Sequence, residues 1–422
     1  MKRYDEYKDT GIDWLPKLPS HWEGQKMKYC FIERSEKNHP NEQILCATQS
    51  QGVIPQSLYQ NRVVVVNKGF EGLKLVKEGD FVISLRSFEG GIEYAYYQGI
   101  ISAAYTILSP TVKQNTNYFK LLFKSHPFIQ LLQTCVTGIR EGQNINYSLL
   151  GRKFIPIPPL AEQEKIVSYL ESKTLCIDAY VAERERELQL LNELKESEIA
   201  NVITRGLNPD VKMKDSGIPW IGMIPDHWEV VRIKAILSES KEKTDFDGGT
   251  LLSLSQYTGI TLKENAKKTG MFEAESTVGY NIVHPGQFVM NIMLAWNGSY
   301  AVSDYEGVIS PAYCVFNFNV DCERKYFHYL LRLPSYAGTF KTQSKGIIDS
   351  RLRLYPQYFL SFKTIVPPIE EQRAIVAYIE DKCSKVNSLI DELEAEIEYL
   401  KEYKQKLIAD CVTGQINVQS EI

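Results

Sequence analysis

Apolar residues recur at helical spacing in two long stretches, each of which follows a Pro-Pro dipeptide. The first stretch runs from about Ala161 to Thr204 without Pro or Gly, and Glu and Gln occupy its first turns, as is typical of helix starts. The second stretch repeats this pattern after residue 368. The shared apolar seams predict that two long helices pack together. The seam positions are Ile166, Leu170, Ile177, Val181, Leu188 and Leu191 in the first stretch and Ile375, Ile379, Val386, Ile390, Ile397 and Leu400 in the second.

Ahead of each long helix the pattern changes to short apolar runs that are broken by Gly, Asn and Ser. The runs 62–67, 80–85 and 287–290 are typical of strands that are separated by turns. Helical spacing returns around 118–132 and 326–333. We therefore predict two globular lobes of mixed α and β structure, which makes the fold class α+β.

The two halves of the chain are copies of one unit. The opening Lys8-Asp9-Thr10-Gly11-Ile12-Asp13-Trp14 returns 206 positions later from Lys214, and Pro158-Pro159 with its Glu-Gln returns 209 positions later from Pro367. Matches between these points keep their order, which indicates a tandem repeat with few insertions. The predicted domains are a first lobe at 1–157, a central helix at 158–206, a second lobe at 207–366 and a C-terminal helix at 367–416.

Length and composition fit this division. A chain of 422 residues exceeds what one hydrophobic core usually supports, and 44% hydrophobic residues suffice for a core in each lobe. No window approaches about 18 consecutive apolar residues. The 8 cysteines include no Cys-x-x-Cys pair, so neither a zinc site nor a disulfide framework is indicated. We expect a soluble, cytoplasmic protein with reduced thiols, no metal site and no membrane partner.

The overall charge of −4 is unevenly distributed. Residues 1–160 carry +5 and residues 205–366 carry +2, whereas 161–204 carry −5 and 367–422 carry −6. Phosphates are attracted to positive surfaces, so the lobes suit a nucleic acid better than the helices do. A solvated acidic helix face beside ordinary lobes explains the same numbers, and charge alone leaves both interpretations open.

Motifs for catalysis are nearly absent. The chain has no Gly-Lys dipeptide, and hence no usual phosphate-binding P-loop, and it lacks the Asn-Pro-Pro-aromatic signature of adenine methyltransferases. Asp226, Glu239 and Lys241 loosely follow the spacing of metal-dependent nucleases, but the first copy lacks this set. His21 and His227 match between the copies and are interpreted as packing residues. The chain is therefore predicted not to be an enzyme.

The whole chain resembles the specificity (S) subunits of type I restriction-modification systems, the HsdS family. The resemblance rests on the Trp-containing lobe openings, the helix starts Pro-Pro-Leu-Ala-Glu-Gln-Glu and Pro-Pro-Ile-Glu-Glu-Gln-Arg, and the helix ends at Gly206 and Gly414. It implies that each lobe is a target-recognition domain for one half of a split, asymmetric DNA site. It further implies that the helices act as spacer and docking surface for modification (methyltransferase) subunits, which we expect to number two.

The resemblance also implies that restriction/translocase subunits join the full complex. S-adenosylmethionine, ATP and Mg²⁺ would be bound by the partner subunits, and this chain would hold no cofactor.

The predicted helix length gives an estimate of the gap between the two half-sites. Two head-to-tail copies whose helices form an antiparallel coiled coil would place the lobes at opposite ends, related by a pseudo-two-fold axis. A helix of about 40 residues spans roughly 60 Å, comparable to about 17 base pairs. We therefore expect the helices to set the gap between the half-sites.

Candidate DNA contacts are sought in loops after predicted strands, because reading bases needs polar side chains aimed at groove edges. The preferred loops are 86–91 and 293–298, which differ almost wholly between the copies, as suits lobes with different half-sites. Loops 140–146 and 345–353 and the shared Gln-x-x-Gly turn are further candidates. The predicted contacts with double-stranded DNA are Gln49, Lys68, Arg86, Ser87, Arg140, Gln143, Asn144, Gln256, Trp296, Asn297, Lys345, Arg351 and Arg353.

Two other classes of function were weighed against DNA recognition. A nuclease requires a set of metal-binding carboxylates that the sequence does not offer. A helical scaffold explains the long helices but not two polar, turn-rich lobes of net positive charge.

Overall fold

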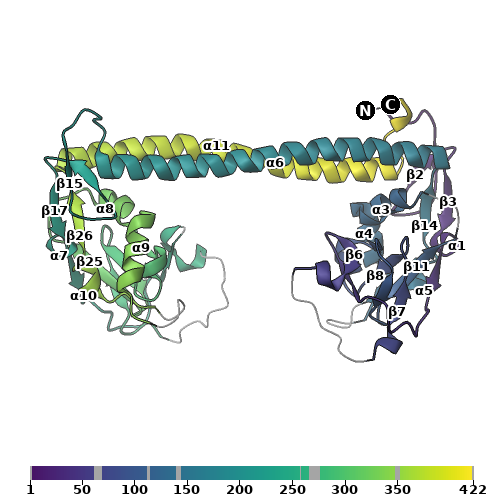
Figure 1. Cartoon of the computed structure of the whole chain (residues 1–422), viewed down its shortest axis with the longest axis horizontal. Helices are drawn as coiled ribbons and strands as arrows, with labels where there is room; N and C mark the ends of the chain where they lie inside the picture. The colour runs from purple at the N-terminus through teal and green to yellow at the C-terminus, as the bar shows by residue number, and fades with distance from the viewer. Residues whose placement is uncertain are drawn as a thin grey trace. The chain divides into compact units, whose positions relative to one another are not determined.

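A computed structural model of the chain describes residues 2–60, 69–111, 115–138, 144–256, 258–265, 276–346 and 352–420. It forms two compact units, Met1–Arg186 with Leu393–Ile422, and Glu187–Glu392. Both units contain parts of the two long helices, α6 (Leu160–Arg205) and α11 (Ile369–Val412), as Figure 1 shows. These bounds agree with the helices predicted from apolar spacing.

The first lobe, residues 2–157, is built around an antiparallel sheet in the order β4-β11-β8-β9. Antiparallel strand pairs β1–β2, β3–β14, β5–β6, β7–β10 and β12–β13 accompany the sheet. The sheet strands are β4 Phe31–Arg34, β8 Phe81–Ile83, β9 Glu93–Tyr94 and β11 Thr106–Pro110. The paired strands are β1 Tyr7–Asp9, β2 Lys17–Pro19, β3 Glu23–Lys26, β14 Phe154–Ile157, β5 Leu45–Thr48, β6 Gly52–Pro55, β7 Lys74–Val76, β10 Gly99–Ile101, β12 Val136–Thr137 and β13 Asn144–Ile145. The helices are α1 Met27–Cys30, α2 Ser87–Gly90, α3 Thr116–Lys124, α4 His126–Gln133 and α5 Tyr147–Leu150.

The second lobe, residues 207–366, repeats this plan with a sheet in the order β18-β25-β22-β23. Its strand pairs are β15–β16, β17–β26, β19–β20 and β21–β24. The strands are β15 Met213–Asp215, β16 Met223–Pro225, β17 Glu229–Arg232, β18 Leu237–Ser240, β19 Leu252–Ser255, β20 Gly259–Leu262, β21 Asn281–Val283, β22 Phe288–Asn291, β23 Tyr300–Val302, β24 Gly307–Ile309, β25 Tyr313–Phe318 and β26 Lys363–Val366. The helices are α7 Ile233–Ile236, α8 Arg324–Leu331, α9 Pro334–Gln343 and α10 Pro356–Phe359, with a 3₁₀ turn, η5, at Ala295–Asn297.

Most predicted elements occur, and one differs in a way that proline explains. The strands predicted at 80–85 and 287–290 correspond to β8 and β22, whereas the run 62–67 lies outside the described residues. The single helix predicted at 118–132 is two helices, α3 and α4, separated by Ser125 in an extended conformation with ψ 143°. Pro127 lies in the first turn of α4. A proline there lacks the amide that would bond the preceding turn, so α3 ends before it.

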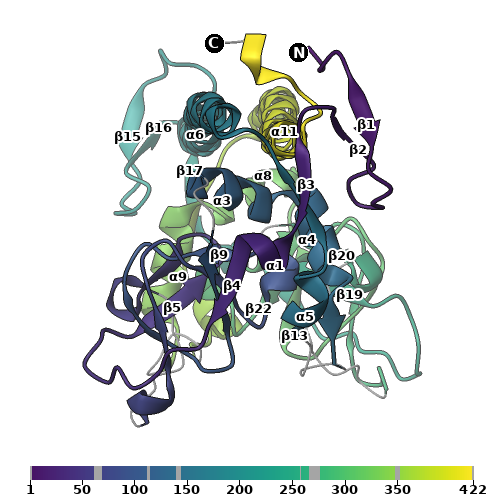
Figure 2. The ribbon, with the colours of Figure 1, turned by 90° about the vertical axis from the view of Figure 1, so that its right-hand side faces the viewer.

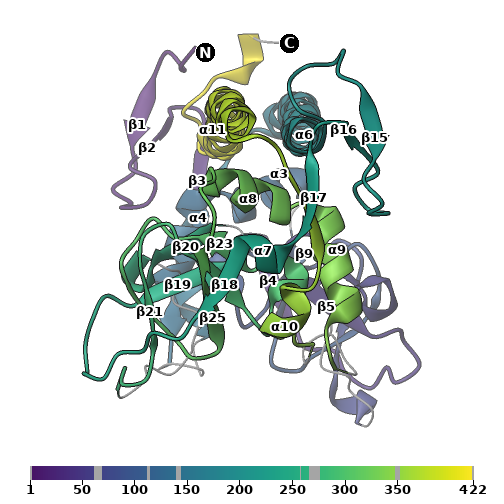
Figure 3. The same cartoon turned by 90° about the vertical axis from the view of Figure 1, so that its left-hand side faces the viewer.

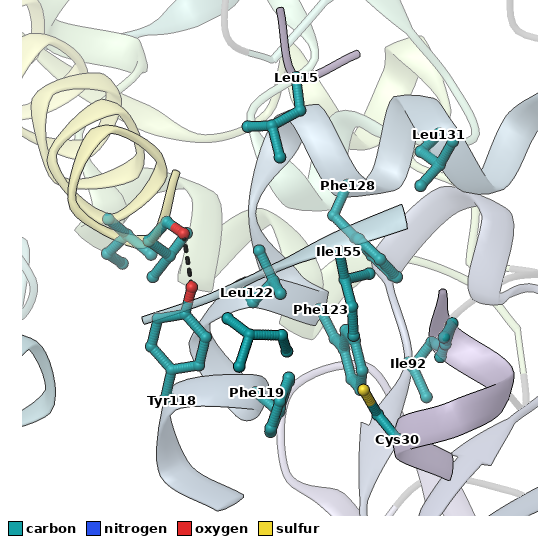
Figure 4. Close-up of a cluster of buried hydrophobic side chains, with 14 of the residues drawn as sticks. Leu15, Cys30, Ile92, Tyr118, Phe119, Leu122, Phe123, Phe128, Leu131 and Ile155 are labelled. Carbon is teal, nitrogen blue, oxygen red and sulfur yellow. Dashed lines mark hydrogen bonds between the residues drawn. The ribbon is translucent and has the colours of Figure 1, made fainter. Parts of the chain in front are cut away.

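The core of the first lobe lies between the sheet and the helix pair α3–α4 (Figure 4). Phe119, Phe123 and Phe128 are all buried, and the Phe123 and Phe128 ring centroids lie 4.8 Å apart. Phe31, at the start of β4, packs edge-on against Phe119 with centroids 5.1 Å apart. Such pairs add to the stabilisation that burial of apolar area already provides. The lobe thus supplies a rigid scaffold for its surface loops.

The two long helices pack antiparallel within each unit. In the first unit, Lys404 Nζ lies 2.6 Å from Asp178 Oδ1 and Lys401 Nζ lies 2.9 Å from Glu185 Oε1. In the second unit, Lys195 donates to Asn387 at 2.6 Å. Residue numbers increase along α6 in the direction in which they decrease along α11. The two helices therefore form an antiparallel coiled coil, as predicted.

Two glutamines attach the lobes to the starts of the long helices. Gln163 is buried, donates to the Pro158 carbonyl at 2.8 Å and accepts from the Asn115 amide at 3.0 Å. Gln372 makes the matching bonds to the Pro367 carbonyl and the Glu323 amide, at 2.8 and 3.0 Å. Asn115 and Glu323 are the N-cap residues of α3 and α8. One amide side chain therefore joins the start of a long helix to the start of a lobe helix.

The lobes also contact the ends of the long helices. Tyr118 donates to the Val412 carbonyl at 2.8 Å, drawn as the dashed line in Figure 4. Tyr326 donates to the Ile203 carbonyl at 2.9 Å. Figures 2 and 3 show the β1–β2 and β15–β16 hairpins beside the ends of α11 and α6 in their respective units. Each lobe is therefore fixed to the start of one long helix and to the end of the other.

No helix in the described part of the chain combines the length and apolar character needed to cross a membrane.

Candidate nucleic-acid interface

The first lobe brings two of the predicted DNA-contacting segments together. The turn between β5 and β6 exposes Gln49, Ser50 and Gln51. Segment 86–91, which contains α2, lies against this turn: a Cβ built on Gly90 would lie 2.7 Å from Gln49 Cδ. Gln49 and the loop predicted at 86–91 therefore form one surface.

Lys124, at the end of α3, forms hydrogen bonds with both the β5–β6 turn and segment 86–91. Its ammonium donates to the Gln49 carbonyl at 3.2 Å, to the Gly90 carbonyl at 2.9 Å and to Glu93 Oε1 at 2.5 Å. Glu93 is only 2% exposed. Burial raises the pKa of the Glu93 carboxyl, and the neighbouring Lys124 charge opposes that rise.

Within segment 86–91 the two predicted contacts differ in accessibility. Arg86 is exposed, whereas Ser87 is buried and its hydroxyl accepts a hydrogen bond from the Ser84 amide at 2.8 Å. Ser87 therefore shapes the loop and does not present its side chain to solvent. Gln133 on α4 supports the loop from its other side by donating to the Phe88 carbonyl at 3.3 Å.

The second lobe repeats this arrangement with different residues. Arg332, directly after α8, donates to the Gln256 carbonyl through Nη2 and to the Tyr300 carbonyl through Nη1 at 2.9 Å. Burial lowers the pKa of the Arg332 guanidinium. Gln256 itself is half-buried in the turn between β19 and β20. In the first lobe Glu93 on β9 pairs with Val82 on β8. The equivalent residue of the second lobe, which pairs with Val289 on β22, is the uncharged Ala301.

The loop at 293–298 is built around the 3₁₀ turn η5. Trp296 is half-buried, its indole donates to the Met293 carbonyl at 3.0 Å, and Lys341 Nζ lies 5.1 Å from its ring centroid. The Asn297 side chain accepts from the Ser299 hydroxyl at 2.9 Å. Both predicted contacts are thus partly engaged in holding the loop.

Three further predicted contacts fall on described residues: Asn144 on β13, which lies against α2, and Lys345 and Arg353, the latter next to Leu354, whose amide donates to the Ile292 carbonyl ahead of the 293–298 loop. Lys345 and Arg353 are exposed, and their backbones exchange two hydrogen bonds of 2.9 Å. Asn144 is half-buried in β13. Lys68, Arg140, Gln143 and Arg351 lie outside the described residues.

Sequence reasoning missed Lys124 and Arg332. A signal for them was present, because each stands six residues after the repeated Tyr118 or Tyr326 and both carry a positive charge. Both lie within the predicted helices 118–132 and 326–333, so a search confined to loops after strands passed over them.

The predicted seam residues of the long helices are all buried or half-buried. Eight large apolar residues in the described parts of these helices are exposed, and Leu160 and Leu175 on α6 have no exposed apolar counterpart on α11. The other six form a repeated set: Tyr180, Leu190 and Leu194 on α6 and Leu389, Tyr399 and Tyr403 on α11. Each α6 residue corresponds to the α11 residue 209 positions later. This repetition outside the seam was the signal that the sequence reasoning overlooked.

These exposed residues lie on one side of the helix pair within each unit. In the first unit, Tyr180 donates to Glu396 at 3.0 Å, and Tyr399 and Tyr403 lie three and seven positions after Glu396. In the second unit, Tyr378 donates to Glu198 at 2.7 Å, and Leu194 lies one turn before Glu198. A groove of about 280 Å³ opens there and is lined by Leu194, Ile199, Ile379, Cys383 and Val386 with charged neighbours.

Comparison with known proteins finds one family to which the chain is similar. A model of the type I restriction modification DNA specificity domain matches residues 15–190. The type I restriction enzyme MjaVIII specificity subunit of Methanocaldococcus jannaschii is 23% identical over 369 residues, which cover 82% of this chain and 81% of that protein. The chain is thus similar to type I restriction-modification specificity subunits, with the family model matching its first lobe and the start of α6.

Solved structures show that the fold of this chain is shared. A chain from a structure of the type I R-M system, described in terms of complex assembly and conformational transition, matches with a TM-score of 0.66 at 16% identity, covering 94% of this chain and 99% of that chain. The HsdS subunit from Thermoanaerobacter tengcongensis matches with a TM-score of 0.51 at 15% identity and coverage of 94% and 98%.

Proposed function

We propose that this chain recognises DNA, and that each lobe reads one half of a bipartite, asymmetric site. One observation carries the proposal. In each lobe a basic residue at the same repeat position bonds the Gln-x-x-Gly turn, and the loop that follows the corresponding sheet strand, β8 or β22, differs almost wholly in sequence between the lobes. A shared scaffold with divergent loops is what two readers of different sequences require. The net positive charge of both lobe segments supports contact with phosphates.

The proposal is tested with the chain in complex with its modification subunits. We expect equilibrium binding to duplex DNA that weakens steeply with salt, and methylated adenines in a split motif in a host that carries the complex. Absence of DNA binding would favour a scaffold. Cleavage of DNA by the chain with Mg²⁺ alone would favour a nuclease. Among the described residues, no three His, Cys, Asp or Glu side chains lie close enough together to hold a metal ion.

We further propose that two modification subunits dock on the long helices through the exposed apolar residues. The apolar triplets Tyr180, Tyr399, Tyr403 and Leu389, Leu190, Leu194 are repeat-related, so they offer one kind of partner two equivalent sites. The helix segments carry −5 and −6, so the partner surface would be apolar at its centre and basic at its rim. The chemistry of S-adenosylmethionine, ATP and Mg²⁺ would then reside in the partners and not in this chain.

Docking is tested by the stoichiometry of the purified complex. Tyr399→Glu with Tyr403→Glu places two charges in one proposed site, so we expect one modification subunit to be lost and the other retained. Leu190→Glu with Leu194→Glu should remove the other. Glu398→Ala, which alters a neighbouring exposed position about 100° around the helix, serves as the control. Retention of both subunits by both double variants would contradict this docking surface.

A further inference from the structure

Lys124 and Arg332 occupy one position of the repeat and make one kind of contact. Each follows the repeated tyrosine of the lobe helix by six residues, and each donates to the carbonyl of the first glutamine in the Gln-x-x-Gly turn. Each also donates to a second carbonyl beside the turn, that of Gly90 in the 86–91 loop of the first lobe or that of Tyr300, the first residue of β23, in the second lobe. The helices that carry them are anchored to the lobe core by Tyr118 and Tyr326, which are fully buried.

The acceptors in these contacts are backbone carbonyls, which every residue type supplies. The turn and the loop can therefore change sequence while the bonds that hold them remain. Hydrogen bonds from a charged donor are also stronger than those between neutral groups, so a single side chain can fix both segments. Such an anchor suits a surface whose side chains must vary from one DNA target to another.

We propose that Lys124 and Arg332 are positioning residues that fix the reading surface of their own lobe, so that each controls discrimination at one half-site. This inference rests on the proposed function, because it presumes that the anchored turn and loop read DNA. In this proposal the two residues touch no base; Lys124 acts through the geometry of the Gln49 turn and the 86–91 loop, and Arg332 acts through the Gln256 turn and the start of β23, which follows the 293–298 loop.

The two anchors differ in how their charge is balanced, and this determines the design of the variants. Lys124 forms an ion pair with the buried Glu93, so removing the lysine alone would leave a buried carboxylate without a counter-ion. The double variant Lys124→Met with Glu93→Gln avoids that charge. Arg332 has carbonyl partners, and Ala301 replaces the acid in the second lobe, so Arg332→Met alone is a clean test.

The experiment uses the full-length chain with its modification subunits and the methylated motif mapped for the wild-type complex. Binding is measured for the cognate duplex and for duplexes with one base pair changed in either half. We expect Arg332→Met to reduce discrimination at the half-site of the second lobe by about tenfold and to leave the other half within about twofold. The Lys124→Met, Glu93→Gln variant should do the reverse. Arg332→Lys should retain most discrimination, because an ammonium can still reach a carbonyl.

Lys120→Met is the matched control in the first lobe, since Lys120 lies one turn earlier on α3 and contacts only the Tyr94 and Tyr96 rings among the interactions described. Thermal unfolding reports whether each variant folds, and Arg332→Gln, which keeps one neutral donor, replaces Arg332→Met if the latter does not. Unchanged discrimination in a folded variant, or equal loss at both half-sites, would overturn the proposal. If the proposed function itself is wrong, the wild-type complex will show neither salt-sensitive DNA binding nor a split methylated motif. That result is distinct from any result obtained with the variants.

Discussion

At the level of single residues, the repeated Pro-Pro-x-x-Glu-Gln motif is explained by attachment of a lobe to a long helix. Gln163 and Gln372 each join a proline carbonyl to the N-cap amide of a lobe helix. The glutamates beside them bind the histidines of the lobe openings: His21 lies 2.9 Å from Glu162, and His227 lies 2.5 Å from Glu371. Both histidines are exposed and join the lobe openings to the long helices through these glutamates, so the prediction that they are packing residues is wrong.

Replacing Gln163 by Leu should destabilise the first unit by about 2 kcal/mol, because two hydrogen bonds are lost and their partners stay partly buried. Chemical denaturation followed by tryptophan fluorescence measures this change. The neighbouring exposed substitution Glu164→Ala should stay within about 0.5 kcal/mol of the wild type. Equal effects of the two substitutions would show that Gln163 does not fix the junction.

The environment of the Glu162 carboxyl predicts that the first unit loses stability in acid. Burial raises the pKa of its carboxyl, but hydrogen bonds to it, among them those of Tyr4 and His21, outweigh burial, and the net pKa lies below the ordinary value of 4.5. A depressed pKa in the folded state stabilises the protein above pH 4.5, and this contribution is lost as the pH falls through the folded pKa. Glu162→Gln should therefore be less stable at pH 7 and show a shallower loss below pH 4.5 in pH-dependent denaturation. A parallel pH dependence of both proteins would contradict this role of Glu162.

At the level of elements, the ends of the long helices depend on glycine. Gly206 and Gly414 follow α6 and α11 with φ of 77° and 75°, a conformation that disfavours residues with a Cβ. A Cβ on Gly414 would lie 2.5 Å from Pro19 Cδ and 3.1 Å from the Trp22 ring. The close approach of the lobe opening to the helix end therefore depends on the missing side chain.

Gly414→Ala should destabilise the first unit by about 1–3 kcal/mol, because it adds both backbone strain and a steric clash. Gly338→Ala is the opposite case. Gly338 lies inside α9 with no atom within 4 Å of a built Cβ, so alanine should stabilise the second unit by about 0.5–1 kcal/mol. Thermal unfolding of both variants checks the two signs together, and a destabilising Gly338→Ala would refute the helix-propensity argument.

At the level of the whole molecule, the length of the helices is proposed to set the gap between half-sites. Deleting residues 186–192 and 389–395 removes two turns from each helix and keeps the Glu185–Lys401 and Lys195–Asn387 pairs on either side. Seven residues correspond to about 10 Å, or about three base pairs. Mapping of methylated adenines should show a motif with a shorter gap and unchanged half-sites. An unaltered motif would refute a spacer role.

Exchange of residues 1–157 for the lobe of another specificity subunit tests the independence of the two readers. The exchanged segment ends with β14, ahead of α6, so the long helices stay intact. We expect one half of the methylated motif to change and the other to persist. A change in both halves would contradict independent reading by the lobes.

The pattern along the chain predicted much of this fold and less of the candidate interface. The apolar seam gave α6 to within one residue at each end, because a helix without Pro or Gly is specified locally, whereas α11 ends four residues before the predicted limit of 416. The interface candidates Gln49 and the 86–91 segment were found through the repeat and through loop divergence. Ser87 was proposed as a DNA contact on the same grounds, yet its hydroxyl bonds the Ser84 amide, a contact that no spacing in the sequence indicates.

The sequence by itself determined the tandem repeat, the two long helices, the mixed lobes and the resemblance that led to the family, because each depends on periodicity or on residues at fixed spacing. Only the tertiary structure decided which segments meet. Lys124 reaches Gln49 and Gly90 across 75 and 34 positions, and Tyr118 reaches the end of α11 across 294. Such contacts follow from how the sheet, helices and termini pack in three dimensions, so a lysine that looked like an ordinary helix residue became the anchor of the proposed reading surface.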